Sequence, residues 1–159
     1  MADVMRVRKA IEVEHYPVAS ATVIEIGDLL YYDGTANQVF PLADFTWNTN
    51  LATTQADLKG SFAGVAMSRS RAGDTDLVRV AISGIAEFPC AAAAFNPDEF
   101  ISVDDNAGGD ALESQKVIAA AVGLSFGKAD KVTASTTVVR FRFWSDIAGQ
   151  PLLPHDAAA

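Results

Sequence analysis

The chain is poor in the residues that carry most covalent and metal chemistry. Its 159 residues include one cysteine, Cys90, and two histidines, His15 and His155, which stand near opposite ends of the sequence. One cysteine cannot form an intrachain disulfide, and the CxxC and Cys/His spacings of zinc sites are absent. Because nucleophilic catalysis needs a base beside Ser, Cys or Thr, this scarcity argues against a catalytic triad. Cys90 is predicted to be a core residue.

Positive charge and long apolar runs are scarce as well. The chain has 12 Lys and Arg against 20 Asp and Glu, a net charge of −8, whereas nucleic-acid binders need clustered cations to displace phosphate counterions. No apolar run approaches the roughly 20 residues of a membrane span, and the basic start has no signal-peptide pattern behind it. We therefore expect a soluble protein made in the cytoplasm, with no nucleic-acid or membrane partner. The glycines form neither GxxxxGK[ST] nor GxGxxG, so no cofactor is expected.

Short runs with a period of two dominate the rest of the sequence. Residues 78–83 and 136–143 place larger apolar side chains on every second position, which is one face of a strand. Turn signals such as Asp33-Gly34 and Ala72-Gly73-Asp74 separate such runs. Weaker strand candidates are Ile11–His15, Ala21–Tyr32, Phe100–Val103, Lys116–Ala121 and Val122–Lys128. This pattern predicts an all-β fold, either a small β-barrel or a β-sandwich.

One segment departs from the strand pattern. Residues 50–58 contain good helix formers with apolar residues about one or two turns apart, and Gly60 follows where a helix would stop. We expect one short helix there. Along the chain we expect an N-terminal arm and first strand in residues 1–20, the β-domain in residues 21–148, and a flexible C-terminal tail in residues 149–159. The first ten or so residues are expected to be an extended arm rather than core.

Two local patterns offer weak alternatives with chemistry. Ser125-Phe126-Gly127-Lys128 matches the short SxxK motif, but its SDN and KTG companions are absent, which favours a strand end followed by a turn. The acidic residues of the second half could gather oxygens around calcium, although their spacing does not match an EF-hand loop and favours a solvated acidic turn. They are Asp98, Glu99, Asp104, Asp105, Asp110 and Glu113. No metal is assigned on this basis.

The order of several segments resembles one known family. These segments are Ile26-Gly27-Asp28-Leu29-Leu30-Tyr31-Tyr32-Asp33-Gly34, Phe62-Ala63-Gly64-Val65-Ala66-Met67, Val78 to Pro89, and Phe95 to Ile101. The order is similar to that of the capsid-cement and head-decoration proteins of tailed bacteriophages, which share an x-G-D-L-V strand, an F-x-G-V-A strand and a V-x-V-x-x-x-G-V-x-E-F strand. In this chain Pro97-Asp98-Glu99 stands where the family has a second Gly-Asp. The resemblance covers about residues 20 to 145.

The resemblance implies an architecture and a partner, and it brings no catalytic residues. It implies a structural virion protein, made in the host cytoplasm, that binds the capsid exterior and stabilises the major capsid protein lattice, as a homotrimer. The candidate interface residues come from the sequence: a basic and apolar group near the start, which could equally be a frayed terminus, and two aromatic residues, for which core packing is the favoured alternative to a protein contact. They are Met5, Arg6, Val7, Arg8, Lys9, Phe45 and Trp47.

The same sequence features are compatible with other functions. The chain could be a different virion accessory domain, on a tail or fibre, or a β-sandwich adhesin module of a cell. It could also be a small β-barrel enzyme with a metal at the acidic turn, but no compact polar pocket is evident from the sequence. We therefore expect no enzymatic activity.

Overall fold

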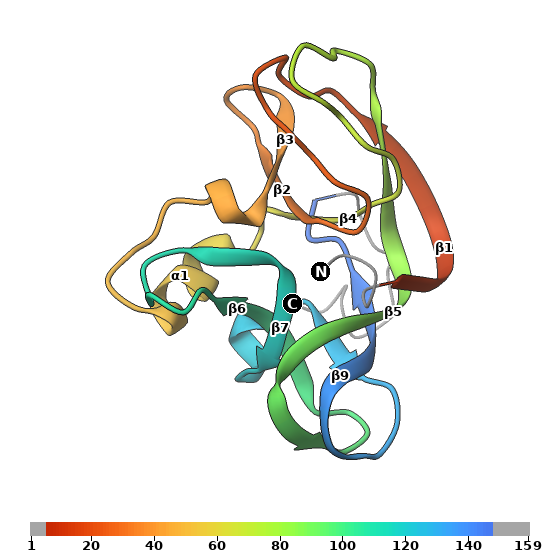
Figure 1. The fold of residues 1–159 in the computed structure, drawn as a ribbon, viewed down its shortest axis with the longest axis vertical. Coiled ribbons are helices and arrows are strands. Elements are labelled where there is room, and N and C mark those ends of the chain that lie inside the picture. Colours follow the sequence, from red (N-terminus) through yellow and green to blue (C-terminus); the bar gives the residue numbers. More distant parts are fainter. Residues whose placement is uncertain (1–5, 148–159) are drawn as a thin grey trace, which may run out of the picture.

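The computed structural model describes residues 6–147, apart from the side chains of Arg6 and Ile11. Five strands form a closed β-barrel (Figure 1): β5 (Val78–Phe95), β7 (Leu112–Ala119), β6 (Phe100–Asp105), β8 (Gly127–Ala129) and β9 (Thr133–Trp144). The ring closes because β9 pairs antiparallel with β5 along most of its length, while the other edge of β5 pairs parallel with β7 at Cys90 and Val117. The predicted all-β barrel is confirmed.

The start of β5 extends out of the barrel, since its pairing with β9 begins only at Ser83, and the first half of the strand carries a second group of strands. On one edge it pairs with β1 (Arg6–Tyr16), and on the other with β4 (Phe62–Ala66), which continues to β2 (Leu29–Asp33) and β3 (Gln38–Pro41). Figure 1 shows this group above the barrel, with β5 running through both. Between residues 6 and 147 the remaining elements are one α-helix and two short 3-10 helices, η2 (Leu42–Asp44) and η3 (Val122–Leu124).

The predicted helix is α1 (Leu51–Leu58). Asn50 begins it as an N-cap, because its side-chain oxygen accepts a hydrogen bond from the backbone N–H of Thr53 at 2.8 Å. The buried Gln55 amide donates to the carbonyl oxygen of Val103 on β6 at 2.7 Å. This contact holds α1 against the barrel.

Residues 6–10, expected to belong to an extended arm, instead form the start of β1 and pair with β5. The register with β5 shifts between Val7 and Lys9 and again after Ala10. These shifts interrupt the alternation of inward and outward side chains, so the sequence of this segment does not show the period of two that identifies a strand. Gly84 permits the approach: a Cβ there would lie 2.1 Å from the carbonyl oxygen of Lys9. Met5 lies outside the described residues, as does the expected C-terminal tail.

Other weak strand predictions are corrected in part. Of residues 21–32, only Leu29 onward is strand, and the preceding residues form a loop with a bridge between Ile24 and Ser70. Residues 122–124 form η3 rather than strand, and only Gly127–Ala129 pair in the barrel. In both segments apolar residues stand close together although several are exposed, Val23, Ile26 and Val122 among them, so a short apolar run alone does not identify a strand.

Three turns share one geometry. In each, the backbone N–H of the fourth residue donates to the carbonyl of the first, and the carboxylate of the fourth accepts from the backbone N–H of the first. The third residue has a positive φ, as in a type II turn. The turns are Glu25–Asp28, Arg71–Asp74 and Asn96–Glu99, with φ values of 94°, 97° and 68° at Gly27, Gly73 and Asp98. Asp98 and Glu99 thus occupy the positions that a glycine and an aspartate occupy in the other two turns.

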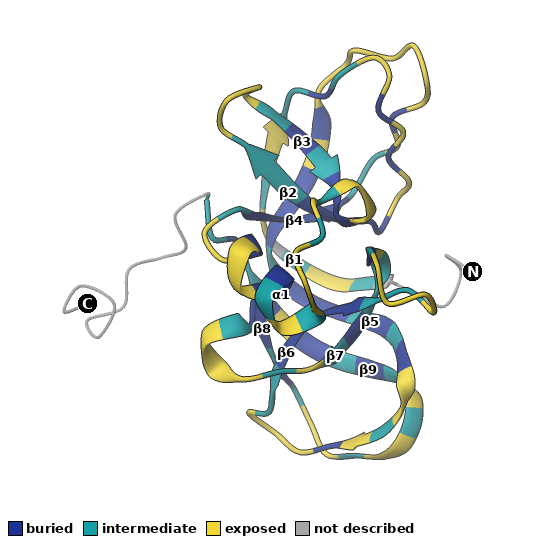
Figure 2. Ribbon diagram, turned by 90° about the vertical axis from the view of Figure 1, so that its left-hand side faces the viewer, coloured by how far each residue is buried: buried dark blue, intermediate teal, exposed yellow. Residues whose placement is uncertain are grey.

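Two apolar clusters lie on opposite sides of the β4 and β5 backbones. The larger fills the barrel and extends to Leu29 and Val65, while the smaller lies beneath β2, β3 and the loop before them. Figure 2 shows the buried residues concentrated along the barrel strands and β4. The rings of Phe62 and Phe126 stack with centroids 4.1 Å apart and connect β4 to the barrel.

Cys90 is buried in the larger cluster, as predicted. Within residues 6–147 no helix is long and apolar enough to cross a membrane.

Candidate functional site

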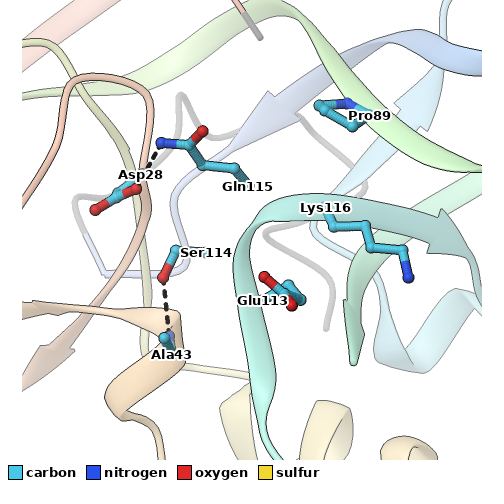
Figure 3. Close-up of a pocket in the computed structure, with 7 residues that line it drawn as sticks. All are labelled: Asp28, Ala43, Pro89, Glu113, Ser114, Gln115 and Lys116. Carbon is cyan, nitrogen blue, oxygen red and sulfur yellow. Dashed lines mark hydrogen bonds between the residues drawn. The ribbon is translucent and has the colours of Figure 1, made fainter. Parts of the chain in front are cut away.

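The first hollow lies where the barrel meets the upper strands (Figure 3). It encloses about 440 Å³ and is lined by Asp28, Ala43, Pro89, Glu113, Ser114, Gln115 and Lys116. We call it the Asp28 pocket. Asp28 accepts hydrogen bonds from the Gln115 amide at 2.8 Å and from the backbone N–H of Glu25 at 2.9 Å. The Ser114 hydroxyl accepts one from the backbone N–H of Ala43 at 2.9 Å. These contacts fasten the turn before β2, and η2, to strand β7.

Four polar side chains of the Asp28 pocket, Asp28, Ser114, Gln115 and Lys116, are engaged in structural contacts. Lys116 directs its ammonium group to the Asp104 carboxylate at 3.2 Å. Burial raises the pKa of Asp28 above its ordinary value; the hydrogen bonds from Glu25 and Gln115 oppose the rise, and the charges of Glu25 and Asp44 add to it. The lining contains no histidine or cysteine. We interpret the pocket as a connection between the two parts of the fold.

The raised pKa makes a pH-dependent prediction for Asp28→Asn. Because the folded protein holds this proton more tightly than the unfolded chain, wild-type stability contributed by Asp28 is present at low pH and is lost as pH rises from 3.8 through the raised value. Asparagine carries no charge and therefore removes this loss. Its side-chain oxygen can still accept from the backbone N–H of Glu25, and its NH2 group can donate to the side-chain oxygen of Gln115 once the Gln115 amide has rotated. The free energy of unfolding of the variant minus that of wild type should therefore rise with pH.

Urea denaturation at several pH values between about 3.5 and about 7, which lie on both sides of the ordinary Asp pKa of about 4, measures this difference. Asp74→Asn is the control, since Asp74 occupies the matching position of an exposed turn. A difference that stays flat or falls with pH would contradict the assignment of Asp28 as a carboxyl destabilised by burial.

The second hollow lies on the surface beside α1. It has a volume of about 460 Å³ and is lined by Tyr31, Asp33, Phe45, Thr46, Trp47, Asn48 and Asp57. We call it the Trp47 pocket. The rings of Tyr31 and Phe45 meet edge to face, with centroids 5.0 Å apart and planes at 85°. The ring of Phe40 also stacks on the ring of Tyr31, with centroids 5.5 Å apart. Tyr31, Phe40 and Phe45 therefore support one another.

Two carboxylates complete this pocket and are held in place. Asp33 accepts hydrogen bonds from the backbone N–H groups of Thr35 and Ala36 at 2.8 and 3.3 Å. Asp57 on α1 accepts one from the Asn48 amide at 2.7 Å. Among the described residues, neither carboxylate has a cation within ion-pair distance. The pocket therefore combines aromatic walls with uncompensated negative charge.

The structure separates the two groups of sequence-predicted interface residues. Phe45 and Trp47 line the same pocket, each half-buried. Arg8 lies on β1, where it pairs with Glu87 of β5 at 3.0 Å, and Figure 1 shows β1 on the other side of the molecule from α1. Lys9 is exposed and Val7 packs against the core. For Arg6 only the backbone is described, and its pairing with Glu87 places it in β1.

Sequence reasoning missed the residues that turn two aromatic side chains into a pocket. Tyr31 was recognised only as part of a strand, and Asp33 only as part of a turn signal. Asp57 lies on the expected helix, but nothing in the sequence indicates which strand α1 faces. Tyr31 and Asp33 lie on β2, Asp57 lies on α1, and Phe45 and Trp47 lie between them in the sequence, so only the tertiary structure brings these three segments together.

The acidic residues considered for calcium do not converge on one point, and two of them accept hydrogen bonds from separate partners. Glu99 accepts from the backbone N–H of Asn96 at 2.6 Å, and Asp110 accepts from the Asn106 amide at 2.9 Å. Between residues 6 and 147 no group of three or more His, Cys, Asp or Glu side chains is arranged to hold a metal. Ser125 and Lys128 of the SxxK match also have separate partners, the carbonyl of Val122 and the ring of Phe100.

No protein-family model matches the chain, and no curated protein matches it significantly.

Proposed function

We propose that this chain is a structural virion protein that binds the outer surface of a tailed-phage capsid and stabilises the lattice of the major capsid protein, as a homotrimer. The resemblance of its segment order to the capsid-cement proteins supports the proposal, and the motif residues now have physical roles. Gly27 and Asp28 form a turn anchored to β7, whereas Gly64 and Gly84 allow neighbouring strands to approach closely. The proposal includes no catalytic step.

The observation that carries the proposal is the Trp47 pocket. Trp and Tyr are enriched at energetically dominant positions of protein interfaces, especially where surrounding contacts hold them rigid. Here Phe45 and Trp47 lie between η2 and the N-cap of α1, on a segment fixed at both ends. The side chain of Tyr31 supports Phe45 from strand β2. A rigid aromatic surface of this kind can bury area on a partner at small cost in conformational entropy.

The test is co-sedimentation with capsids of the phage that encodes the chain, prepared without outer accessory proteins. Wild-type protein should bind saturably and raise the temperature at which the shells rupture. Trp47→Ala and Phe45→Ala should weaken binding by about tenfold or more if these residues are binding hot spots. Leu77→Ala is the matched control, because Leu77 is a large apolar residue that is 56% exposed outside this pocket.

Thermal melting of each free variant separates lost binding from lost folding. Sedimentation velocity on the free protein, and cryo-electron microscopy of the decorated shell, test the trimer. Absence of binding to capsids overturns the proposal, and binding to phage tails instead would support the tail or fibre alternative.

A further inference from the structure

The chemistry of the Trp47 pocket indicates what kind of group it receives. Its walls are the side chains of Tyr31, Phe45 and Trp47, whose π faces attract cations. Asp33 and Asp57 add two negative charges to the same hollow, and Asp44 lies close to the phenol of Tyr31, which donates to the Asp44 carbonyl at 3.4 Å. Aromatic faces and carboxylates around one hollow select a positively charged group with an apolar stem.

The charge around Tyr31 is consistent with this selection. Burial raises the pKa of the Tyr31 phenol above its ordinary value, and the negative charges of Asp44 and Asp33 raise it further. A field that opposes ionisation of a phenol also favours a cation. The hydrogen bonds that Asp33 and Asp57 accept fix their positions but leave their charges uncompensated.

The chain itself is a poor source of that cation. Six of its eleven described Lys and Arg side chains already have carboxylate partners: Arg8 pairs with Glu87, Lys59 with Asp146, Arg69 with Glu25, Lys116 with Asp104, and both Arg140 and Arg142 with Asp130. A second copy would also bring a net charge of −8 toward a negative pocket. Charge complementarity therefore favours a different protein.

We propose that the Trp47 pocket binds an arginine or lysine side chain of a partner protein, held between the aromatic faces and the carboxylates of Asp33 and Asp57. The inference rests on the proposed function, in which that partner is the major capsid protein. An arginine fits best, because its planar guanidinium stacks on aromatic rings while its N–H groups reach carboxylates. Binding is expected to weaken with salt.

The probe is the capped tripeptide acetyl-Gly-Arg-Gly-amide, compared with the same peptide carrying citrulline, which has nearly the same shape and no charge. Titration of the full chain is followed by NMR at the Trp47 indole N–H. The arginine peptide should shift this signal saturably, while the citrulline peptide should leave it in place. Asp33→Asn and Asp57→Asn should each weaken arginine-peptide binding about threefold, by loss of one surface charge interaction.

The asparagine variants keep the hydrogen-bond acceptor that each turn and helix contact needs, so folding is preserved and only charge is removed. Asp74→Asn is the control, since Asp74 caps the backbone N–H of Arg71 in a turn outside the pocket and should leave binding unchanged. Equal binding of both peptides, no binding of the arginine peptide, or no effect of Asp33→Asn combined with Asp57→Asn would overturn the inference.

The same variants distinguish this inference from the proposed function. If the peptide binds as expected but capsids do not, the pocket is a cation site and the capsid proposal fails. If capsids bind and the double Asp33→Asn, Asp57→Asn variant binds them equally well, the capsid proposal stands and the cation inference fails.

Discussion

Replacing Gly64 with alanine should lower the free energy of unfolding by more than about 3 kcal/mol, because two separate costs add at this position. Gly64 has a φ of 146°, which L side chains rarely adopt, and a Cβ there would lie 2.1 Å from the carbonyl oxygen of Ala81. Strand β4 pairs with β2 on one side and β5 on the other. It therefore cannot move away from Ala81 without breaking the pairing with β2. Urea denaturation of Gly64→Ala measures the loss.

Two other glycines separate the cost of a positive φ from the cost of a close contact. Gly60 has a φ of 92°, and a Cβ added there would have no neighbour within 4 Å, so Gly60→Ala should show backbone strain alone, about 1–2 kcal/mol. Gly123 has neither a positive φ nor a neighbour within 4 Å, and Gly123→Ala should be neutral or stabilising by up to about 1 kcal/mol. Equal losses at Gly60 and Gly64 would show that the close contact with Ala81 contributes nothing.

Phe126→Ala should destabilise the protein by about 3–5 kcal/mol, as expected for truncating a fully buried phenylalanine. Phe126 is 2% exposed and stacks on Phe62 with planes only 10° apart, and the ring of Phe141 lies 6.3 Å away. Truncation leaves a cavity where the barrel and β4 meet. Since this contact joins the two parts of the fold, a lower m-value in urea is also expected if β4 and its neighbours then unfold separately.

Phe100→Ala is the matched control. Phe100 is half-buried on β6, with the Lys128 ammonium 5.1 Å from its ring centroid. Removing it should cost about 1 kcal/mol, from partial burial and an exposed cation–π contact. A similar loss for Phe100→Ala and Phe126→Ala would contradict the central position assigned to the Phe62–Phe126 stack.

Local sequence patterns predicted those features that depend on neighbouring residues. Alternating apolar residues place Val139, Phe141 and Phe143 inside the barrel, because successive side chains of a strand point to opposite faces. Asn50 begins α1 through a hydrogen bond to a residue three positions later. The aromatic pair Phe45 and Trp47 was also identified in advance, and the structure places both residues in one pocket.

The features that local patterns missed depend on irregular pairing. Residues 6–10 were expected to be an arm, because their charges and the shifted register hide a strand whose partner, β5, lies about 75 residues later in the chain. The Asn96–Glu99 turn lacks the glycine of a Gly-Asp motif, yet Asp98 adopts the positive φ and Glu99 supplies the capping carboxylate. Residue identity alone did not reveal that equivalence.

By itself the sequence determined the all-β class, the single helix, the buried cysteine and the excess of negative charge, because each follows from composition or from spacing within a few residues. Only the tertiary structure decided how β5 joins the barrel to the upper strands and how Tyr31, Trp47 and Asp57 come to line one pocket. Those arrangements depend on contacts between segments far apart in the chain. Their free energy comes from close packing and backbone approach, as at Gly64 and Gly84, which no local pattern records.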